Sequence, residues 1–316
     1  MDSDLILGLD IGGTKSSAVL AARTGEVVDR ATAPTEIADG PEATIARLLA
    51  DARALIERNS VPRSRVLGVG ICCGSPLDSK EGVVWSPPTL PGWDGVPVVR
   101  MVQDALGLPA ALENDADCSA LAELFFGAGV GKENIVSFTW GTGIGAGIVL
   151  GGRLYSGSWG LAGEIGHITY VTGGRLCQCG KSGCIEAYAA GSSISRIVRE
   201  MLDEGRPSVL AGSREIDAKA VCDAARRGDQ LAEGVLRDAA RAMGQAVLIA
   251  AHTLNPEVIT LGTLAVKAAD ILMPEVLRVV EAEAWPRIRD GLEIVPSPLG
   301  DRVQDLAAIS AYLARL

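Results

Sequence analysis

A strand–turn–strand pattern occurs twice in this 316-residue chain and limits the fold more than any other feature does. Residues 5–22 predict two short apolar strands around the turn at 11–15. Residues 135–150 predict a second such pair around the turn at 141–145. The copies lie roughly 130 residues apart, which is the size of a domain and not of a solenoid repeat. We therefore expect two related domains.

Both turns combine glycines with a threonine: Gly12, Gly13 and Thr14 in the first, Gly141 and Thr142 in the second. Glycine has no Cβ, so the backbone N–H groups of such a turn can approach an anion closely. A plain hairpin is the alternative for the first turn taken alone. The repeat favours two phosphate-binding turns that clamp a nucleoside triphosphate. Neither turn fits a P-loop or a Rossmann fingerprint.

Between the two copies the pattern alternates helix and strand, as in an α/β fold. The long segment 74–93 is rich in proline, and we expect it to lack regular structure and to line a ligand cleft. The sequence predicts helices over 41–59, 96–106 and 116–126, and strands over 66–73 and 110–113.

Asn114 and Asp115 follow the strand predicted over 110–113 and precede a helix. In α/β sheets ligands bind at the carboxyl ends of the strands. A helix N-terminus favours the ionised carboxyl, so Asp115 could accept a proton from a substrate hydroxyl. The alternative is that Asp115 is only the N-cap of the helix, a common position for aspartate. The local sequence leaves both interpretations open.

Three cysteines and a histidine form a second cluster: Cys177, Cys179, Cys184 and His167. Three thiolates and one imidazole complete a tetrahedral zinc site with no open position, which predicts a structural ion. A disulfide and inert packing are the alternatives. The four remaining cysteines are expected to be small core residues: Cys72, Cys73, Cys118 and Cys222.

Two carboxylates flank this cluster. Glu164 lies three residues before His167, and Glu186 lies two residues after Cys184. A loop held by a metal can present both carboxylates to a ligand. We therefore expect this segment to hold a structural metal ion and to bind a ligand.

Charge and composition exclude several classes of partner. A net charge of −10 and a pI near 4.9 disfavour nucleic acid and membrane surfaces. The start of the chain lacks a positive leader, and no apolar run approaches the length that spans a membrane. We expect a cytoplasmic protein, in which reduced thiols suit zinc better than disulfides.

Five motifs extend over nearly the whole chain: Leu9-Asp10-Ile11-Gly12-Gly13-Thr14-Lys15, Glu113-Asn114-Asp115-Ala116, Gly141-Thr142-Gly143-Ile144-Gly145, Gly163-Glu164-Ile165-Gly166-His167 and the segment 177–186. Together they resemble the ROK family (repressors, open reading frames and kinases), in particular its bacterial glucokinase-like sugar kinases. The resemblance implies an α/β fold similar to actin and hexokinase, with two ribonuclease-H-like domains and an interdomain cleft. It implies one domain of residues 1–113 with the last helix, 303–316, and a larger one of 114–302 with the zinc loop.

The resemblance also implies roles for individual residues. Asp115 would be the general base, His167 would bridge zinc and sugar, and Asp10 would approach Mg²⁺ through water. The residues implied to bind the sugar are Gly74, Thr89, Asn114, Asp115, Glu164, His167 and Glu186. Those implied to hold ATP are Asp10, Gly12, Gly13, Thr14, Lys15, Gly141, Thr142, Gly143, Gly262 and Thr263.

Three positions depart from the family pattern, and one of them, Ser310 in place of a common glycine, is interpreted as a tolerated packing change. Thr89 stands where the family often has asparagine, and a hydroxyl cannot offer both an amide donor and a carbonyl acceptor, so the sugar is less certain than the chemistry. Thr263 stands where a second glycine is usual, and its side chain could narrow the adenosine pocket.

The sequence thus predicts an ATP-dependent hexose kinase that phosphorylates the 6-hydroxyl of glucose or a related hexose. The alternative is a sugar-binding regulator or a catalytically silent member, because the family also contains repressors. Those repressors carry a DNA-binding segment ahead of the first phosphate motif, whereas here only an acidic tetrapeptide precedes the first strand. A homodimer is expected by resemblance alone. The identity of the hexose, and polyphosphate as a donor in place of ATP, stay open.

Overall fold

The computed structural model describes residues 4–316, which form two compact units. Unit 1 runs up to Gly131 and includes Gly152–Ala162 and Asp301–Leu316, and unit 2 comprises Lys132–Gly151 and Gly163–Gly300. Residues 1–3, on which part of the expectation of no leader depends, lie outside the described residues. The domain boundaries inferred from the resemblance stay a prediction.

Unit 1 is built on a five-stranded sheet of order β3-β2-β1-β4-β8. The first three strands form an antiparallel meander that contains the predicted pair, and the last two run parallel to β1. The strands are β1 (Leu5–Ile11), β2 (Lys15–Ala22), β3 (Val27–Pro34), β4 (Val66–Cys73) and β8 (Ala110–Asn114). Because Asp10 pairs with Cys72 and Cys73 with Asn114, the carboxyl ends of β1, β4 and β8 lie side by side.

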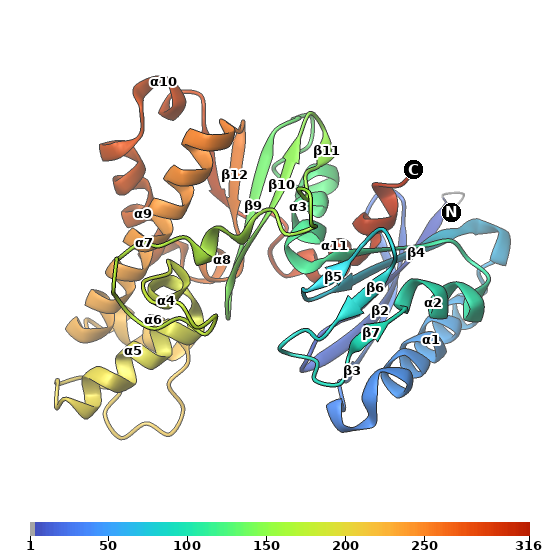
Figure 1. Ribbon diagram of the computed structural model, residues 1–316, viewed down its shortest axis with the longest axis horizontal. Coiled ribbons are helices and arrows are strands. Elements are labelled where there is room, and N and C mark those ends of the chain that lie inside the picture. The colour runs from blue at the N-terminus through green and yellow to red at the C-terminus, as the bar shows by residue number, and fades with distance from the viewer. Residues whose placement is uncertain (1–3) are drawn as a thin grey trace. The chain divides into compact units, whose positions relative to one another are not determined.

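Helices cover both faces of this sheet (Figure 1). On one side lie α1 (Gly40–Arg58) and α2 (Val98–Leu106), whose apolar residues pack into one core with β1, β2 and β4. On the other side lie α3 (Asp115–Phe126) and α11 (Val303–Leu313), close to the C-terminus. A Cβ on Gly70 of β4 would lie 1.8 Å from the Ala308 carbonyl oxygen of α11, so glycine allows this close approach.

The segment 74–93 is more ordered than the sequence predicted. Val83–Trp85 (β6) pairs with Leu77–Asp78 (β5) on one side and with Asp94–Val96 (β7) on the other, in a small antiparallel sheet. The expectation of no regular structure was therefore wrong for the first part of the segment, 74–85, which has two valines and a single proline, whereas the rest has three prolines. The proline-rich stretch 86–93 is the longest part of the segment without helix or strand.

Unit 2 repeats the arrangement of unit 1. Its strands follow the order β10-β9-β12-β13. An antiparallel pair, β9 (Ile135–Trp140) and β10 (Ile144–Leu150), is followed by β12 (Val258–Leu261) and β13 (Glu293–Pro296), both parallel to β9. In both units the first pair of strands is joined by a Gly/Thr turn. The internal repeat seen in the sequence is therefore a repeat of topology.

A largely helical core completes unit 2 around the long helix α7 (Gln230–Leu254), which packs on α9 (Ala269–Glu283). The other helices are α4 (Glu186–Ala189), α5 (Gly191–Asp203), α6 (Ala218–Arg226), α8 (Leu264–Lys267) and α10 (Pro286–Arg289). The chain also has five short segments. In unit 1 these are η1 (Ile37–Asp39), η2 (Arg63–Arg65) and β11 (Arg153–Leu154); η3 (Glu164–His167) belongs to unit 2, and η4 (Gly300–Arg302) begins at its last residue.

Several smaller expectations hold. Cys72, Cys73, Cys118 and Cys222 are buried thiols, as expected for small core residues. Between residues 4 and 316, no helix is at once long enough and apolar enough to cross a membrane.

An ion pair between a buried carboxylate and a half-exposed guanidinium joins β8 to the residues that follow α11. Glu113 is 7 % exposed, and its carboxylate lies 3.3 Å from the Arg315 guanidinium. Burial nevertheless outweighs Arg315 and raises the pKa of Glu113 to about 7 from an ordinary value of 4.5. Ionised Glu113 therefore lowers stability, and this cost appears as pH rises from about 4.5 to about 7.

We predict that Glu113→Gln gains stability relative to the wild type as pH rises over this range, by up to about 3 kcal/mol. Urea unfolding of both proteins at pH 5, 6 and 8 measures the difference. Glu36→Gln, at an exposed carboxylate, is the matched control and should show little change. A Glu113→Gln effect that does not vary with pH would contradict the prediction.

Candidate functional site

The first glycine turn, between β1 and β2, packs against the segment that carries Thr89. A Cβ on Gly13 would lie 2.4 Å from the Thr89 carbonyl oxygen, so no larger residue fits there without movement. The Gly12 carbonyl accepts a 2.7 Å hydrogen bond from the Thr35 hydroxyl. The side chains of Thr14 and Lys15 are exposed, and Lys15 donates to Gln304 at 2.8 Å. The glycines of the turn are thus held by contacts with Thr35 and Thr89, while the side chains of Thr14 and Lys15 remain accessible.

Asn114, and not Asp115, caps helix α3. The Asn114 Oδ1 atom accepts a hydrogen bond from the Asp117 N–H at 2.7 Å, and its Nδ2 donates to the Ser75 hydroxyl at 2.8 Å. Asp115 is the first residue of the helix, keeps an exposed surface and accepts from the Ala116 N–H at 2.9 Å. The interpretation of Asp115 as an N-cap is therefore wrong, and its carboxylate is available for another role.

The surrounding protein shifts the pKa of Asp115 in the direction opposite to the one expected. The helix N-terminus favours the ionised form, but desolvation outweighs the backbone N–H groups and raises the pKa of this carboxyl. Asp10, at the end of β1, behaves similarly: burial first, and then the negative charge of Asp115, raise the pKa of Asp10 to about 6. Two carboxyl groups that influence each other thus lie together in unit 1.

Ser75 is a polar residue of this site that sequence reasoning did not single out. It follows β4, whose end pairs with that of β8, and it accepts the Asn114 side-chain bond. A Cβ on the neighbouring Gly74 would lie 3.8 Å from the Thr89 hydroxyl. The place of Ser75 directly after a buried strand was the available signal. Asp10, Gly74, Ser75, Thr89, Asn114 and Asp115 form what we call the strand-end cluster.

The second glycine turn, between β9 and β10, is held by the start of two helices. The carbonyl of Gly141 accepts from the Gly191 N–H at 2.8 Å, and that of Thr142 accepts from the Ser192 hydroxyl at 2.8 Å. After the turn, the Ile144 N–H donates to Glu186 Oε2 at 2.9 Å. The turn is therefore attached to α5 through its carbonyls and to α4 through one carboxylate.

His167, Cys177, Cys179 and Cys184 converge in unit 2, and we call them the metal cluster. One ligand atom from each lies within 4.8 Å of all the others. The sulfurs of Cys179 and Cys184 are 3.7 Å apart. A tetrahedral zinc with Zn–S bonds of about 2.3 Å holds its sulfurs about 3.8 Å apart, whereas a disulfide requires about 2.05 Å. The residues fit a metal ion, and the disulfide alternative is excluded in this geometry.

The two nitrogens of His167 face different partners. Nδ1 lies 3.8 Å from the Cys177 sulfur and 3.8 Å from Glu186 Oε1. Nε2 lies 3.8 Å from Glu164 Oε2. The imidazole can therefore offer Nδ1 to a metal and keep Nε2 for a second partner.

Glu186 connects the metal cluster with the second glycine turn. One of its oxygens accepts the Ile144 N–H, and the other lies 3.5 Å from the Cys177 sulfur. A Cβ on Gly143 would lie 3.0 Å from Glu186 Oε2, so the turn and the carboxylate are in close contact. Glu186 is thus placed between the metal cluster and the second glycine turn, in contact with both.

Gly262 and Thr263 follow β12 and lie beside the same turn. The Gly262 N–H donates to the Phe138 carbonyl at 2.8 Å, and the Thr263 hydroxyl lies 3.6 Å from where a Cβ on Gly141 would be. Thr263 has φ 31° and ψ −79°, a region that β-branched residues rarely adopt. Replacement of the usual glycine by threonine has therefore placed a strained residue next to the turn.

The structure brings the predicted residues together in two sets, one in each unit. Unit 1 holds Asp10, Gly12, Gly13, Thr14, Lys15, Gly74, Thr89, Asn114 and Asp115. Unit 2 holds Gly141, Thr142, Gly143, Glu164, His167, Cys177, Cys179, Cys184, Glu186, Gly262 and Thr263.

Comparison with known proteins identifies the class first. A ROK glucokinase from Streptomyces griseus, solved with glucose and AMPPNP, superposes with a TM-score of 0.81 at 29 % identity, covering 98 % of this chain and 99 % of that one. A ROK-family transcriptional regulator, a homologue of the Escherichia coli Mlc protein, superposes with a TM-score of 0.88 at 29 % identity, covering 99 % of this chain and 79 % of that one. The expected actin/hexokinase-like fold is confirmed.

The sequence matches agree. The glucokinase of Thermotoga maritima is 35 % identical over 315 residues, covering 98 % of both chains. Residues 6–304 match the description of the ROK family. This chain belongs to the ROK family.

The strain at Thr263 is testable. We predict that Thr263→Gly raises the free energy of unfolding by about 1 kcal/mol, because relief of the unfavourable φ exceeds the entropic cost of a glycine. Thr263→Ser keeps the strained backbone and a hydroxyl, so it should give no such gain. Urea unfolding of the three proteins measures the difference. A Thr263→Gly protein less stable than the wild type would show that threonine fits this turn without strain.

Proposed function

We propose that the protein is an ATP-dependent hexose kinase that transfers the γ-phosphate to the 6-hydroxyl of glucose or a related hexose. The observation that carries the proposal is the position of Asp115. Its carboxylate does not cap α3, and it lies at the carboxyl end of β8, beside Asn114 and in the same unit as a Gly/Thr turn. The glucokinase relatives support the same reaction class.

In this proposal Asp115 accepts the proton of the attacking hydroxyl. A pKa raised above that of an ordinary aspartate brings the base closer to the pKa that favours proton transfer near neutral pH. The transition state of phosphoryl transfer is loose, so orientation of the oxygen matters more than strong basicity. Asn114 is held by Ser75 and can orient the sugar without taking the proton.

The remaining sugar contacts are assigned to Gly74, Thr89, Glu164, His167 and Glu186. A carboxylate accepts hydrogen bonds from two vicinal hydroxyls, and a site built this way rejects analogues that lack them. The Nε2 atom of His167 is the nitrogen assigned to the sugar, since Nδ1 faces the thiols.

The nucleotide is assigned to the two glycine turns and to Gly262 and Thr263. Backbone N–H groups of the turns would bind phosphate oxygens, with Lys15 as an accessible charge. Asp10 would hold Mg²⁺, which keeps much of its water and neutralises charge on the phosphates when bound.

The metal cluster is assigned to structural zinc. Four protein ligands leave no open position, so the ion would supply no reacting group. Its effect would be to hold His167 and the cysteine loop in place, while Glu186 keeps the hydrogen bond that it accepts from the Ile144 N–H. A cytoplasmic location and a homodimer complete the proposal.

A sugar-binding regulator is the second candidate, because a transcriptional regulator of this family superposes well on the chain and xylose repressors are among its relatives. The two candidates share a sugar-binding site. They differ in turnover, which needs Asp115.

Phosphoryl transfer separates the two candidates. We predict that Mg-ATP supports turnover of one sugar among glucose, mannose, fructose, allose, glucosamine, N-acetylglucosamine and N-acetylmannosamine in a coupled assay. Asp115→Asn should lower kcat by about 10²–10⁴-fold while sugar binding by calorimetry persists. Asp104→Asn, at an exposed carboxylate of α2, is the control. Saturable sugar binding without turnover would contradict the proposed kinase reaction and support the proposal of a sugar-binding regulator.

Metal analysis tests the zinc assignment separately. We predict about one zinc per purified chain by mass spectrometry, and a marked loss of zinc and of sugar affinity in Cys179→Ser. Cys222→Ser, at a buried thiol outside the cluster, should keep both. Zinc far below one per chain in the wild type, together with unchanged sugar affinity in Cys179→Ser, would contradict a structural ion.

A further inference from the structure

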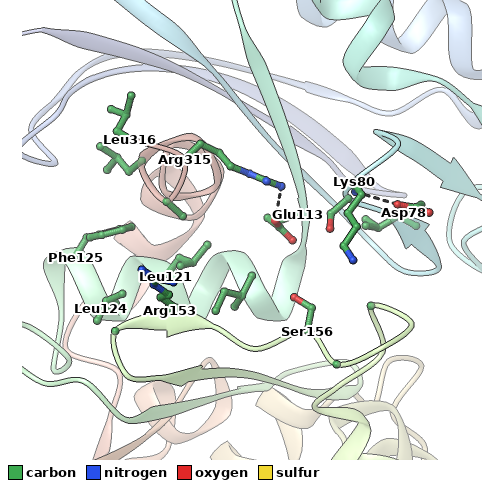
Figure 2. A pocket seen from close by; sticks show the side chains of 18 of the residues that line it. Asp78, Lys80, Glu113, Leu121, Leu124, Phe125, Arg153, Ser156, Arg315 and Leu316 are labelled. Carbon is green, nitrogen blue, oxygen red and sulfur yellow. Dashed lines mark hydrogen bonds and ion pairs between the residues drawn. The ribbon is translucent and has the colours of Figure 1, made fainter.

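A cavity of about 780 Å³ opens in unit 1 at a place that the proposed reaction does not use. Figure 2 shows its walls: the loop after β5, the end of β8, one face of α3, the end of α11 and the segment 152–160. None of the residues of the strand-end cluster lines it. Its volume is in the range of small-molecule sites, about 300–1,000 Å³. We call it the Glu113 cavity.

The acids of the cavity are already satisfied within the protein. Asp78 accepts hydrogen bonds from the backbone N–H groups of Lys80 and Glu81 at 2.9 and 3.0 Å. Glu113 is paired with Arg315, and the dashed line in Figure 2 marks this contact. Neither carboxylate therefore needs a cationic ligand.

Two cations of the cavity have no partner in the protein. The side chains of Lys80 and Arg153 make no hydrogen bond or ion pair with any residue of 4–316, and both are exposed. Among the charged side chains that line the cavity, the unpaired ones are thus both positive, although the whole chain carries a net charge of −10. An anion is the ligand that this arrangement would attract.

One wall is apolar. Leu121, Leu124 and Phe125 follow the i, i+3, i+4 spacing of one helix face of α3 and line the cavity together. In Figure 2 they lie at one end together with Arg153, whereas Lys80 and Glu113 lie toward the other. A ligand with a carbon skeleton as well as a charged group would use both ends.

The walls of the cavity continue directly into the strand-end cluster. Glu113 immediately precedes Asn114 and Asp115 in the chain, and Asp78 follows Ser75 by three residues. Since Ser75 and Asn114 are hydrogen-bonded to each other, an occupant of the cavity would touch both segments that set the position of Asn114.

We propose that the Glu113 cavity is an effector site for a small organic anion, a phosphate ester or a carboxylate, held by Lys80 and Arg153 and by the apolar face of α3. Binding changes the position of Asn114 and hence the affinity for the sugar. The binding claim stands on the cavity alone, and the effect on sugar affinity rests on the proposed function.

Calorimetry with four probes tests the binding: inorganic phosphate, glucose 6-phosphate, citrate and benzoate. The first two report a phosphate group and the last two a carboxylate. We expect saturable binding of at least one probe, weakened tenfold or more in the double variant Lys80→Glu, Arg153→Glu. The control is Arg23→Glu, Arg206→Glu, which changes the net charge equally at exposed arginines outside the cavity and should bind as the wild type does.

Two results would overturn the proposal. One is no saturable binding of any probe to the wild type. The other is equal loss of binding in both double variants, or loss in Lys15→Ala with none in the cavity variant, which would place the anion on the first glycine turn. Circular dichroism and thermal unfolding of each variant separate loss of binding from loss of fold.

The effect on the sugar is measured in the same proteins by the change in sugar Kd when the bound probe is added. We expect a shift of threefold or more in the wild type and none in the cavity variant. An unchanged Kd with the probe bound would refute the coupling. An absence of phosphoryl transfer with probe binding intact would refute only the proposed kinase reaction.

Discussion

The parallel pairing of β4 with β1 on one side and β8 on the other is the constraint on which the site of unit 1 depends. Its register brings Asp10 beside Cys72 and Cys73 beside Asn114, so three strands end at the same edge. Each end then continues into a different kind of segment: a glycine turn, the Gly74-Ser75 segment and a helix. A shift of one residue in β8 would move Asn114 away from Ser75 and turn its side chain to the other face.

In unit 2 a side chain, and not strand register, positions the residues around the glycine turn. Here the second glycine turn is tied to the metal cluster by Glu186, which reaches the Ile144 N–H with one oxygen and the Cys177 thiol with the other. A metal ion bound by the proposed cluster would order His167 and the cysteine loop that leads to Glu186, although the proposed chemistry needs no zinc. Glu186 itself is tied to the turn by the hydrogen bond that it accepts from the Ile144 N–H.

Periodicity and turn chemistry were enough to predict the main sheet strands and the helices of unit 1, though not β5, β6 and β7, and the repeat in unit 2, because these depend on local sequence. The choice between Asn114 and Asp115 as the cap of α3 was not predictable: both residues suit the position, and the contact with Ser75, 39 residues away, decides it. The raised pKa of Asp115 has the same origin, since desolvation depends on residues distant in sequence. The strand β6 was missed because prolines further along the same segment suggested an irregular loop.

The overall fold does not distinguish a kinase from a regulator, because a glucokinase and a transcriptional regulator both superpose on this chain with TM-scores above 0.8. The distinction has to come from individual groups. In the proposed function, a protein that only senses a sugar would need the residues assigned to the sugar hydroxyls, such as Glu164 and His167. It would not need Asp115, a carboxylate that does not cap α3, because Asn114 does, and whose pKa is raised by desolvation. The position and the raised pKa of Asp115 are features that proton transfer from a sugar would use, so they favour the proposed kinase reaction over a regulator.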